Sequence, residues 1–256
     1  MEKQLLMVLP RKKVFMSSKQ SNSCKSCLKL TEMEKQHHSM ISTLSHEIRN
    51  PLTLIYSSLQ LLEKESPEVA ESFLWPQIKE DVQDTIRLLK DISILNRSST
   101  VSSQNIPLYS FLKGLTDSFQ ALMQERNITF LTYLDPQLLH LPFTGDEIKL
   151  KEALMNLLLN AADALDSCRY SGQILLTAVV CDRQLNIHIR DNGPGIPEDY
   201  LPTLFDPFVT HKTGGTGLGL SIARNAAISH GGTLTVETSS SGDSYTDFCL
   251  TLPLNL

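Results

Sequence analysis

Two stretches in the first hundred residues repeat apolar side chains at helical spacing. Steps of three and four residues build one stripe along the first stretch, namely Met40, Leu44, Ile48, Leu52, Ile55, Leu59 and Leu62. The second stretch, whose first helical residue we predict to be Pro76, carries Ile78, Val82, Ile86, Leu89 and Ile92. Between them, Lys64–Glu68 predicts a stop, with Ser66 and Pro67 able to start a short helical turn. One hairpin cannot bury both stripes, so the pattern predicts a homodimer with a four-helix bundle.

The rest of the chain alternates helical and strand patterns. We expect helices over residues 108–125, 146–166 and 218–229, and strands over 128–134, 174–180, 185–190, 233–238 and 245–252. Such a mixture indicates helices layered on a mostly antiparallel sheet, and therefore an α+β chain. A serine-rich stretch separates the two parts. The predicted organisation is a flexible basic segment (1–30), a helical domain (31–98), a linker (99–105) and an α/β domain (106–256).

Charge and composition narrow the class of protein. The net charge is −5 over 256 residues, but residues 1–30 hold seven Lys/Arg and one acid, which gives them +6 and leaves −11 for the rest. A basic arm can contact anionic lipid, nucleic acid or an acidic partner, although a solvated terminus is the simpler interpretation. The acidic body argues against nucleic acid as the main ligand. No apolar run reaches the roughly 20 residues of a membrane span, and an odd number of cysteines, five, fits a reducing cytoplasm.

The first chemical motif is Ser45-His46-Glu47-Ile48-Arg49-Asn50-Pro51. His46 points away from the apolar stripe, so we expect an exposed nucleophile with Glu47 placed to take its ring proton. Asn50 lies one turn further on the same face, and Pro51 predicts a kink. An isolated His-Glu pair would more often be an ordinary surface pair, but a proline inside a strong helical pattern is typical of a functional site.

The second motif lies in the helix predicted at 146–166. Asn156 and Asn160 are one turn apart and share a face. Two carboxamide oxygens placed in this way suit Mg²⁺, and phosphate oxygens can complete the coordination shell of the ion. Alone, the pair is also compatible with the polar edge of an amphipathic helix.

Two glycine-rich segments follow. The first segment comes directly after a strand and contains Asp191, Gly193 and Gly195. A carboxylate at this place can accept a hydrogen bond from an adenine amino group, and the glycines let the backbone approach the base closely. The second segment runs from Phe205 to Leu220, and it can wrap phosphates with backbone amides in front of a helix N-terminus. Phe205 and Phe208 in this segment can anchor a loop that closes over the nucleotide, and Lys212 can reach the terminal phosphates. The other candidate residues of the segment are Gly215, Gly217, Leu218 and Gly219. The second segment is neither a Walker A loop nor a dinucleotide-binding fingerprint. Taken alone, the first segment is also compatible with a plain turn, and the second with a flexible loop.

Together and in this order, the four motifs resemble the two-component sensor histidine kinases over about residues 31–256, and more weakly the sporulation-type kinases of Firmicutes. The resemblance assigns His46, Glu47 and Asn50 to the phosphoacceptor box, Asn156 and Asn160 to the box that holds Mg²⁺, and the glycines, Asp191 and Lys212 to ATP binding. It implies a helical dimerisation domain followed by a Bergerat-type α/β sandwich that binds ATP. It further implies autophosphorylation on His46 and transfer to an aspartate of a response regulator. Because Asn50 stands where bifunctional members often carry Asn or Thr, it also implies a phosphatase activity.

Two other activities were weighed. ATP hydrolases of the gyrase type resemble the same nucleotide fold, but they use a glutamate where this chain has Asn156, which cannot act as a general base. A non-enzymatic adaptor is disfavoured by the intact motifs. No sensory domain fits into residues 1–30, so an unknown partner supplies the signal or the chain is constitutive. Cys24 and Cys27 form half of a zinc motif, which a dimer can complete with a second pair.

Overall fold

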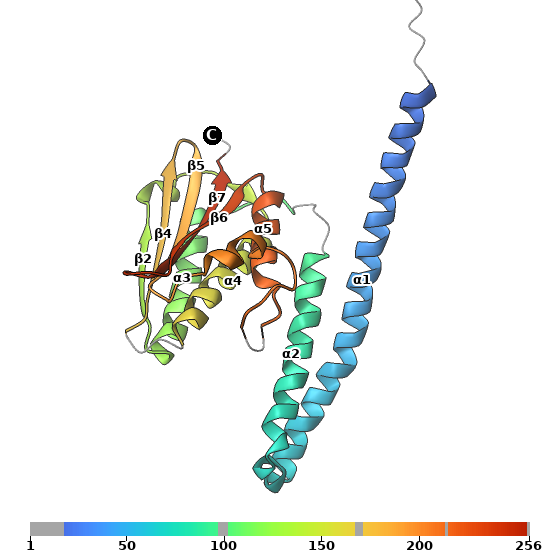
Figure 1. Cartoon of the computed structure of the whole chain (residues 1–256), viewed down its shortest axis with the longest axis vertical. Coiled ribbons are helices and arrows are strands. Elements are labelled where there is room, and N and C mark those ends of the chain that lie inside the picture. Colours follow the sequence, from blue (N-terminus) through green and yellow to red (C-terminus); the bar gives the residue numbers. More distant parts are fainter. Residues whose placement is uncertain (1–17, 97–101, 167–170, 213–214, 255–256) are drawn as a thin grey trace, which may run out of the picture.

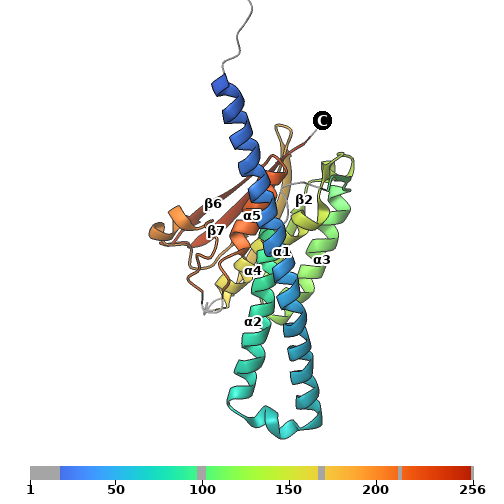
Figure 2. The ribbon, with the colours of Figure 1, turned by 90° about the vertical axis from the view of Figure 1, so that its right-hand side faces the viewer.

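The N-terminal half of the molecule is a long helical hairpin (Figure 1). A computed structural model describes residues 18–96, 102–166, 171–212 and 215–254, with side chains from Met40 onward. Helix α1 (Ser18–Glu65) and helix α2 (Leu74–Leu95) are joined by the short 3₁₀ helix η1 (Pro67–Glu71). The hairpin's closed end extends away from the α/β domain in both views (Figures 1 and 2).

Helix α1 begins inside the basic segment predicted over residues 1–30, whose flexibility stays a prediction. The backbone of residues 18–30 continues the helix, although these residues have no apolar periodicity. Extending an existing helix adds one hydrogen bond per residue and needs no new nucleus, so a pattern is not required. The side chains of Cys24 and Cys27 lie outside the described ones, so their metal site stays a prediction.

The turn between the helices follows the predicted signals. Helix α1 ends at Glu65, and Pro67 opens η1 after Ser66. Helix α2 begins at Leu74, two residues earlier than expected, which places Pro76 in the first turn, where its missing N–H removes no intrahelical bond. Helix α1 runs through Pro51 as one element.

The C-terminal part is a five-stranded sheet with its helices on one face (Figure 1). The strands are β2 (Thr129–Leu134), β4 (Gln173–Cys181), β5 (Gln184–Asp191), β6 (Thr233–Ser239) and β7 (Tyr245–Pro253), in the order β2-β4-β5-β7-β6. Only β2 and β4 pair in parallel, so the predicted mostly antiparallel sheet and α+β class are confirmed. The covering helices are α3 (Leu108–Glu125), α4 (Glu147–Leu165) and α5 (Gly219–Ser229).

The core lies between the sheet and these helices. Alternate residues of β4 and β5 are buried on one face, and α4 buries a broad apolar side against them. The sequence pattern missed the small two-stranded sheet of β1 (Gln104–Asn105) and β3 (Thr144–Gly145), and the 3₁₀ helices η2 (Pro136–Leu139) and η3 (Glu198–Thr203). These elements are too short to show a period, and β1 falls inside the stretch predicted as linker. Part of that linker lies outside the described residues.

The two parts touch where α2 passes the glycine-rich loop that precedes α5. The hydroxyl of Thr216 donates to Oδ2 of Asp91 on α2 at 2.9 Å. Asp91 is partly buried there, and this burial raises the pKa of its carboxyl group. None of the described helices is long and apolar enough to cross a membrane.

Candidate active site

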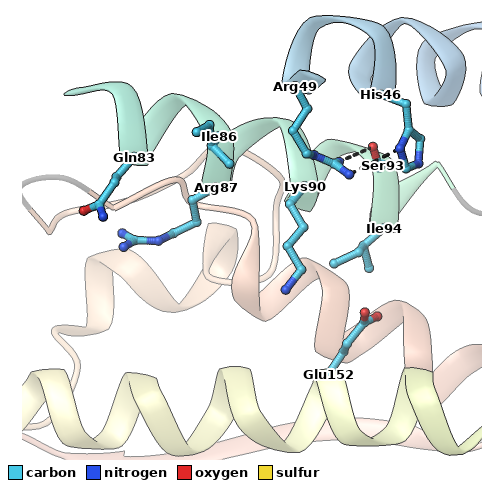
Figure 3. A pocket seen from close by; sticks show the side chains of 9 residues that line it. All are labelled: His46, Arg49, Gln83, Ile86, Arg87, Lys90, Ser93, Ile94 and Glu152. Atoms are coloured by element: carbon cyan, nitrogen blue, oxygen red, sulfur yellow. Dashed lines mark hydrogen bonds between the residues drawn. The ribbon is translucent and has the colours of Figure 1, made fainter. Parts of the chain in front are cut away.

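The predicted nucleophile, His46, is exposed on α1, as its position relative to the apolar stripe requires. Its neighbour Ser45 is buried and donates to the carbonyl of Ile41 within α1 at 2.7 Å. Nδ1 of His46 lies 3.3 Å from Nη1 of Arg49 (Figure 3). Glu47, expected to take the ring proton, is exposed and makes no described hydrogen bond to His46.

A cavity opens beside this histidine. Its volume is about 480 Å³, and it lies between the helical hairpin and α4 (Figure 3). Its wall contains three Lys or Arg side chains and one carboxylate, and it is formed by His46, Arg49, Gln83, Ile86, Arg87, Lys90, Ser93, Ile94 and Glu152. The phosphoacceptor helix and the helix with the asparagine pair therefore border the same space.

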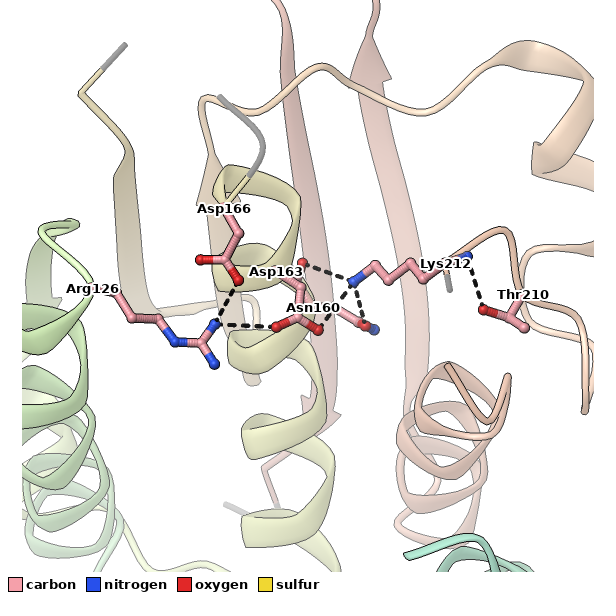
Figure 4. A network of polar contacts seen from close by, with 6 residues as sticks. All are labelled: Arg126, Asn160, Asp163, Asp166, Thr210 and Lys212. Atoms are coloured by element: carbon pink, nitrogen blue, oxygen red, sulfur yellow. Dashed lines mark hydrogen bonds and ion pairs between the residues drawn. The ribbon is translucent and has the colours of Figure 1, made fainter. Parts of the chain in front are cut away.

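The asparagine pair lies on the partly buried face of α4, and Lys212 reaches this face from the loop before α5 (Figure 4). The ammonium group of Lys212 lies 3.2 Å from Oδ1 of Asn160, 3.4 Å from its carbonyl and 3.4 Å from Oδ2 of Asp163. Oδ1 of Asn160 thus accepts a hydrogen bond from the ammonium group of Lys212. Asn156 lies one turn away on the same helix, and a Cβ on Gly219 would come within 3.2 Å of its Oδ1.

Asp163 is a site residue that the sequence reasoning missed. Besides Lys212, it pairs with Arg126, whose Nη1 is 3.2 Å from both Asp163 and Asp166 (Figure 4). Asp163 stands inside the asparagine motif, one turn after Asn160, so the sequence alone could have indicated that it lies near this asparagine. The partner Arg126 comes from the end of α3, and no local pattern connects it to the motif.

Asp191 lies at the end of β5, where its side chain is only 2% exposed. Oδ1 accepts a hydrogen bond from the backbone of Gly193 at 2.9 Å. Burial raises the pKa of this carboxyl group to about 6, while the Gly193 amide and the charge of Lys212 act in the opposite direction. A Cβ on Gly193 would lie 2.6 Å from Oδ1, so only glycine leaves this oxygen accessible.

The second glycine segment is shaped by Gly217. Its φ of +68° favours glycine, and a Cβ there would lie 2.6 Å from the carbonyl carbon of Phe208. Gly217 in turn accepts a hydrogen bond from the Phe208 amide at 2.9 Å. Gly215 and Leu218 flank it, and Gly219 begins α5. The loop therefore reaches the N-terminus of α5 as predicted for phosphate binding.

The remaining predicted residues lie partly in the core and partly on the surface. Phe205 packs against the core and meets Phe248 edge-on at 6.4 Å, whereas Phe208 is 63% exposed. Gly195 has a φ of +76° and lies against the backbone of Ser239. Asn50 is exposed on α1. No cluster of three or more metal-binding side chains occurs among the residues that the structure describes.

Comparisons with known proteins assign both parts of the chain to families. Residues 36–100 match the family model of the His Kinase A (phospho-acceptor) domain, and residues 145–256 match that of the histidine kinase-, DNA gyrase B- and HSP90-like ATPases. The chain is 30% identical over 264 residues to the sensory histidine kinase/phosphatase NtrB of Vibrio alginolyticus, covering 99% of this chain and 71% of that relative. It is 29% identical to sporulation kinase D of Bacillus subtilis, covering 89% of this chain but only 45% of that kinase.

Solved structures show the same fold. Full-length ShkA, solved in complex with AMPPNP, superimposes with a TM-score of 0.67 over 84% of this chain and 46% of its own, at 23% identity. The catalytic domain of the histidine kinase ThkA matches with a TM-score of 0.51 and 27% identity, over 60% of this chain. The order of helical hairpin and ATPase domain, the two family models and the near-complete alignment with NtrB agree, and the chain belongs to the sensor histidine kinases.

Proposed function

We propose that this chain is an ATP-dependent protein-histidine kinase that phosphorylates itself on His46 and passes the phosphoryl group to an aspartate of a response regulator. The observation that carries the proposal is the shared cavity. His46 lines it from α1, and Glu152 lines it from α4. Asn156 and Asn160 follow Glu152 at four-residue intervals on the same face of α4, so one helix carries both a wall of the cavity beside His46 and the proposed Mg²⁺ ligands.

The chain's own residues account for each part of the reaction. Asp191 accepts a hydrogen bond from the adenine amino group, and the loop around Gly217 surrounds the phosphates. A ring nitrogen of His46 uses its lone pair to form a bond to the γ-phosphorus while the bond from that phosphorus to the ADP oxygen breaks. Glu47 takes the remaining ring proton. Asn156 and Asn160 would hold Mg²⁺, which supplies positive charge to the phosphates.

The exposed stripe of the hairpin supports a homodimer. Large apolar side chains on α1 and α2 are exposed to solvent in the single chain, and Leu54 is 69% exposed. The other exposed apolar residues of the two helices are Met40, Ile41, Leu44, Ile48, Ile55, Leu61, Leu62, Leu74 and Ile78. Monomeric proteins rarely expose a contiguous stripe of this kind. A second hairpin would bury it in a four-helix bundle.

A second activity, dephosphorylation of the regulator, is favoured by Asn50. This side chain is exposed one turn after His46, where its amide can orient a water for attack on a docked aspartyl phosphate. The NtrB relatives are named kinase/phosphatases.

Labelling tests the proposal directly. Incubating the full chain with γ-labelled ATP should give a label that is lost in acid and kept in base, because phosphohistidine is a phosphoramidate. His46→Gln should abolish the label and keep ATP binding, and the matched control His140→Gln, which changes an exposed histidine on the α/β domain, should keep both. A label that persists in His46→Gln would refute the assignment of His46.

A further inference from the structure

Arg49 links the phosphoacceptor to the second helix of the hairpin. Its Nη2 donates to the carbonyl of Leu89 at 3.1 Å and to the hydroxyl of Ser93 at 3.0 Å, both on α2. Ser93 is 3% exposed and also donates to the Leu89 carbonyl. The other terminal nitrogen of the guanidinium, Nη1, faces Nδ1 of His46 at 3.3 Å (Figure 3). One side chain therefore contacts both α2 and the predicted nucleophile.

The contact determines where the ring proton of His46 resides. A guanidinium group has five N–H donors, no acceptor, and stays charged in proteins. Nδ1 of His46 must therefore accept, and a neutral ring then carries its single hydrogen on Nε2. A doubly protonated ring would instead place an N–H against the guanidinium.

This arrangement leaves the imidazole without a usable lone pair. The lone pair of Nδ1 is occupied by Arg49, and Nε2 carries the hydrogen. A nucleophilic nitrogen needs a free lone pair, so His46 is held in an unreactive form. Glu47 makes no described hydrogen bond to His46 in this arrangement.

We propose that Arg49 is a positioning residue that holds His46 in its resting tautomer, and that movement of α1 against α2 releases it. The inference rests on the proposed role of His46. When Arg49 withdraws, the hydrogen moves from Nε2 to Nδ1 through solvent, Nδ1–H donates to Glu47, and the Nε2 lone pair becomes free. Because Arg49 is anchored on Leu89 and Ser93, the release is coupled to the register of the two helices.

The guanidinium is suited to such a change. Its Nε is buried and has no hydrogen-bond partner among the described residues, so the resting arrangement leaves one donor unsatisfied. An arrangement with every donor paired would resist a shift of the helices more strongly.

Nitrogen NMR of the full chain, labelled in its histidine rings, tests the proposal without ATP. The signals that disappear in His46→Gln identify residue 46. We expect Nε2 protonated in the wild type and a shift toward protonated Nδ1 in Arg49→Met. Ser93→Ala, which removes one anchor and keeps the guanidinium, should give a smaller shift in the same direction.

Kinetics provide the second measurement. At saturating ATP, Arg49→Met should autophosphorylate about fivefold faster with an unchanged KM for ATP, a factor that corresponds to about 1 kcal/mol. Lys113→Met is the control, since it removes an exposed cation that pairs with Asp117 on α3 and does not line the cavity. It should change neither the ring signals nor the rate.

Three results would overturn the proposal: a wild-type ring protonated on Nδ1, an unchanged tautomer in Arg49→Met, or a shifted tautomer without a faster rate. A label that persists in His46→Gln would instead reject the proposed function, and the nitrogen signals would still show whether Arg49 sets the tautomer.

Discussion

Replacing Asp191 with asparagine should stabilise the ATP-binding domain while weakening ATP binding. The carboxyl group is buried, and this burial raises its pKa from 3.8 to about 6. Between these two pH values, the unfolded chain releases a proton that the folded chain keeps. The free energy of unfolding therefore falls as pH rises through this window and is constant above about pH 6.

The size of the effect follows from the difference between the two pKa values. At about 1.36 kcal/mol per pH unit, the buried charge destabilises the fold by about 3 kcal/mol at neutral pH. An amide at position 191 cannot ionise, and its oxygen can still accept from Gly193. Its NH₂ group needs a partner of its own, so we expect a gain of about 1–3 kcal/mol at pH 8. At pH 4, where wild type is largely protonated, the two proteins should differ little.

Urea unfolding measures this difference in the full chain. Circular dichroism reports on the whole chain, while the single tryptophan, Trp75, lies in α2 and reports on the hairpin. The tryptophan transition should not move in Asp191→Asn, which provides an internal control. A variant that is less stable than wild type at both pH values would refute the argument from burial.

Titration calorimetry with ATP supplies the opposing half of the prediction. Losing a charged acceptor for the adenine amino group should weaken binding by roughly 1.5–3 kcal/mol, about ten- to a hundredfold. Equal affinity in wild type and variant would exclude Asp191 from the adenine contact.

Four further predictions follow from single contacts. Gly217→Ala should raise the Kd for ATP at least about tenfold, because its φ of +68° disfavours any other residue and the added Cβ would lie 2.6 Å from a backbone carbonyl carbon; calorimetry measures it. Asn160→Ala should remove the dependence of ATP affinity on Mg²⁺, which titrations with and without the metal compare; a retained dependence would place the metal elsewhere. Thr216→Val removes the hydrogen bond that lowers the pKa of Asp91, so this pKa should rise further in a carbon-detected NMR titration, and an unchanged value would mean that the contact is absent in solution. Asn50→Ala should keep autophosphorylation near wild type while dephosphorylation of the purified regulator slows at least about tenfold, a barrier change of about 1.4 kcal/mol; a parallel loss of both would make Asn50 structural.

Local periodicity predicted most of the fold because each long element buries one face. The stripe from Met40 to Leu62 predicted a helix that the structure contains, and alternation over 174–180 and 185–190 predicted the two central strands within one or two residues. The two-residue strands β1 and β3 are too short to show a period, and they were missed together with the 3₁₀ helices η2 and η3. The helical backbone of residues 18–30 was missed for a different reason, since it extends an established helix without an apolar face of its own.

The site residues were predictable where a motif is contiguous and not where segments meet through folding. Asp191 and Gly193 stand two residues apart, so their contact is local. The partner of His46 in the structure is Arg49 rather than the expected Glu47, because hydrogen bonds from α2 position the guanidinium. Its anchor, Ser93, is 44 residues away in the sequence, and spacing alone gives no indication of such a contact.

One helix, α4, relates the two halves of the proposed reaction. The cavity that contains His46 is bordered by Glu152, and the cation on Oδ1 of Asn160 lies eight residues further along the same helix, which is about 12 Å at 1.5 Å per residue. Phosphoryl transfer requires the reacting atoms to approach within about 3–3.5 Å. If the phosphates lie at Asn160, the proposed transfer requires the hairpin to move relative to α4. The hydrogen bond between Thr216 and Asp91 ties α2 to the loop proposed to surround the phosphates, so such a movement would have to shift or break this contact.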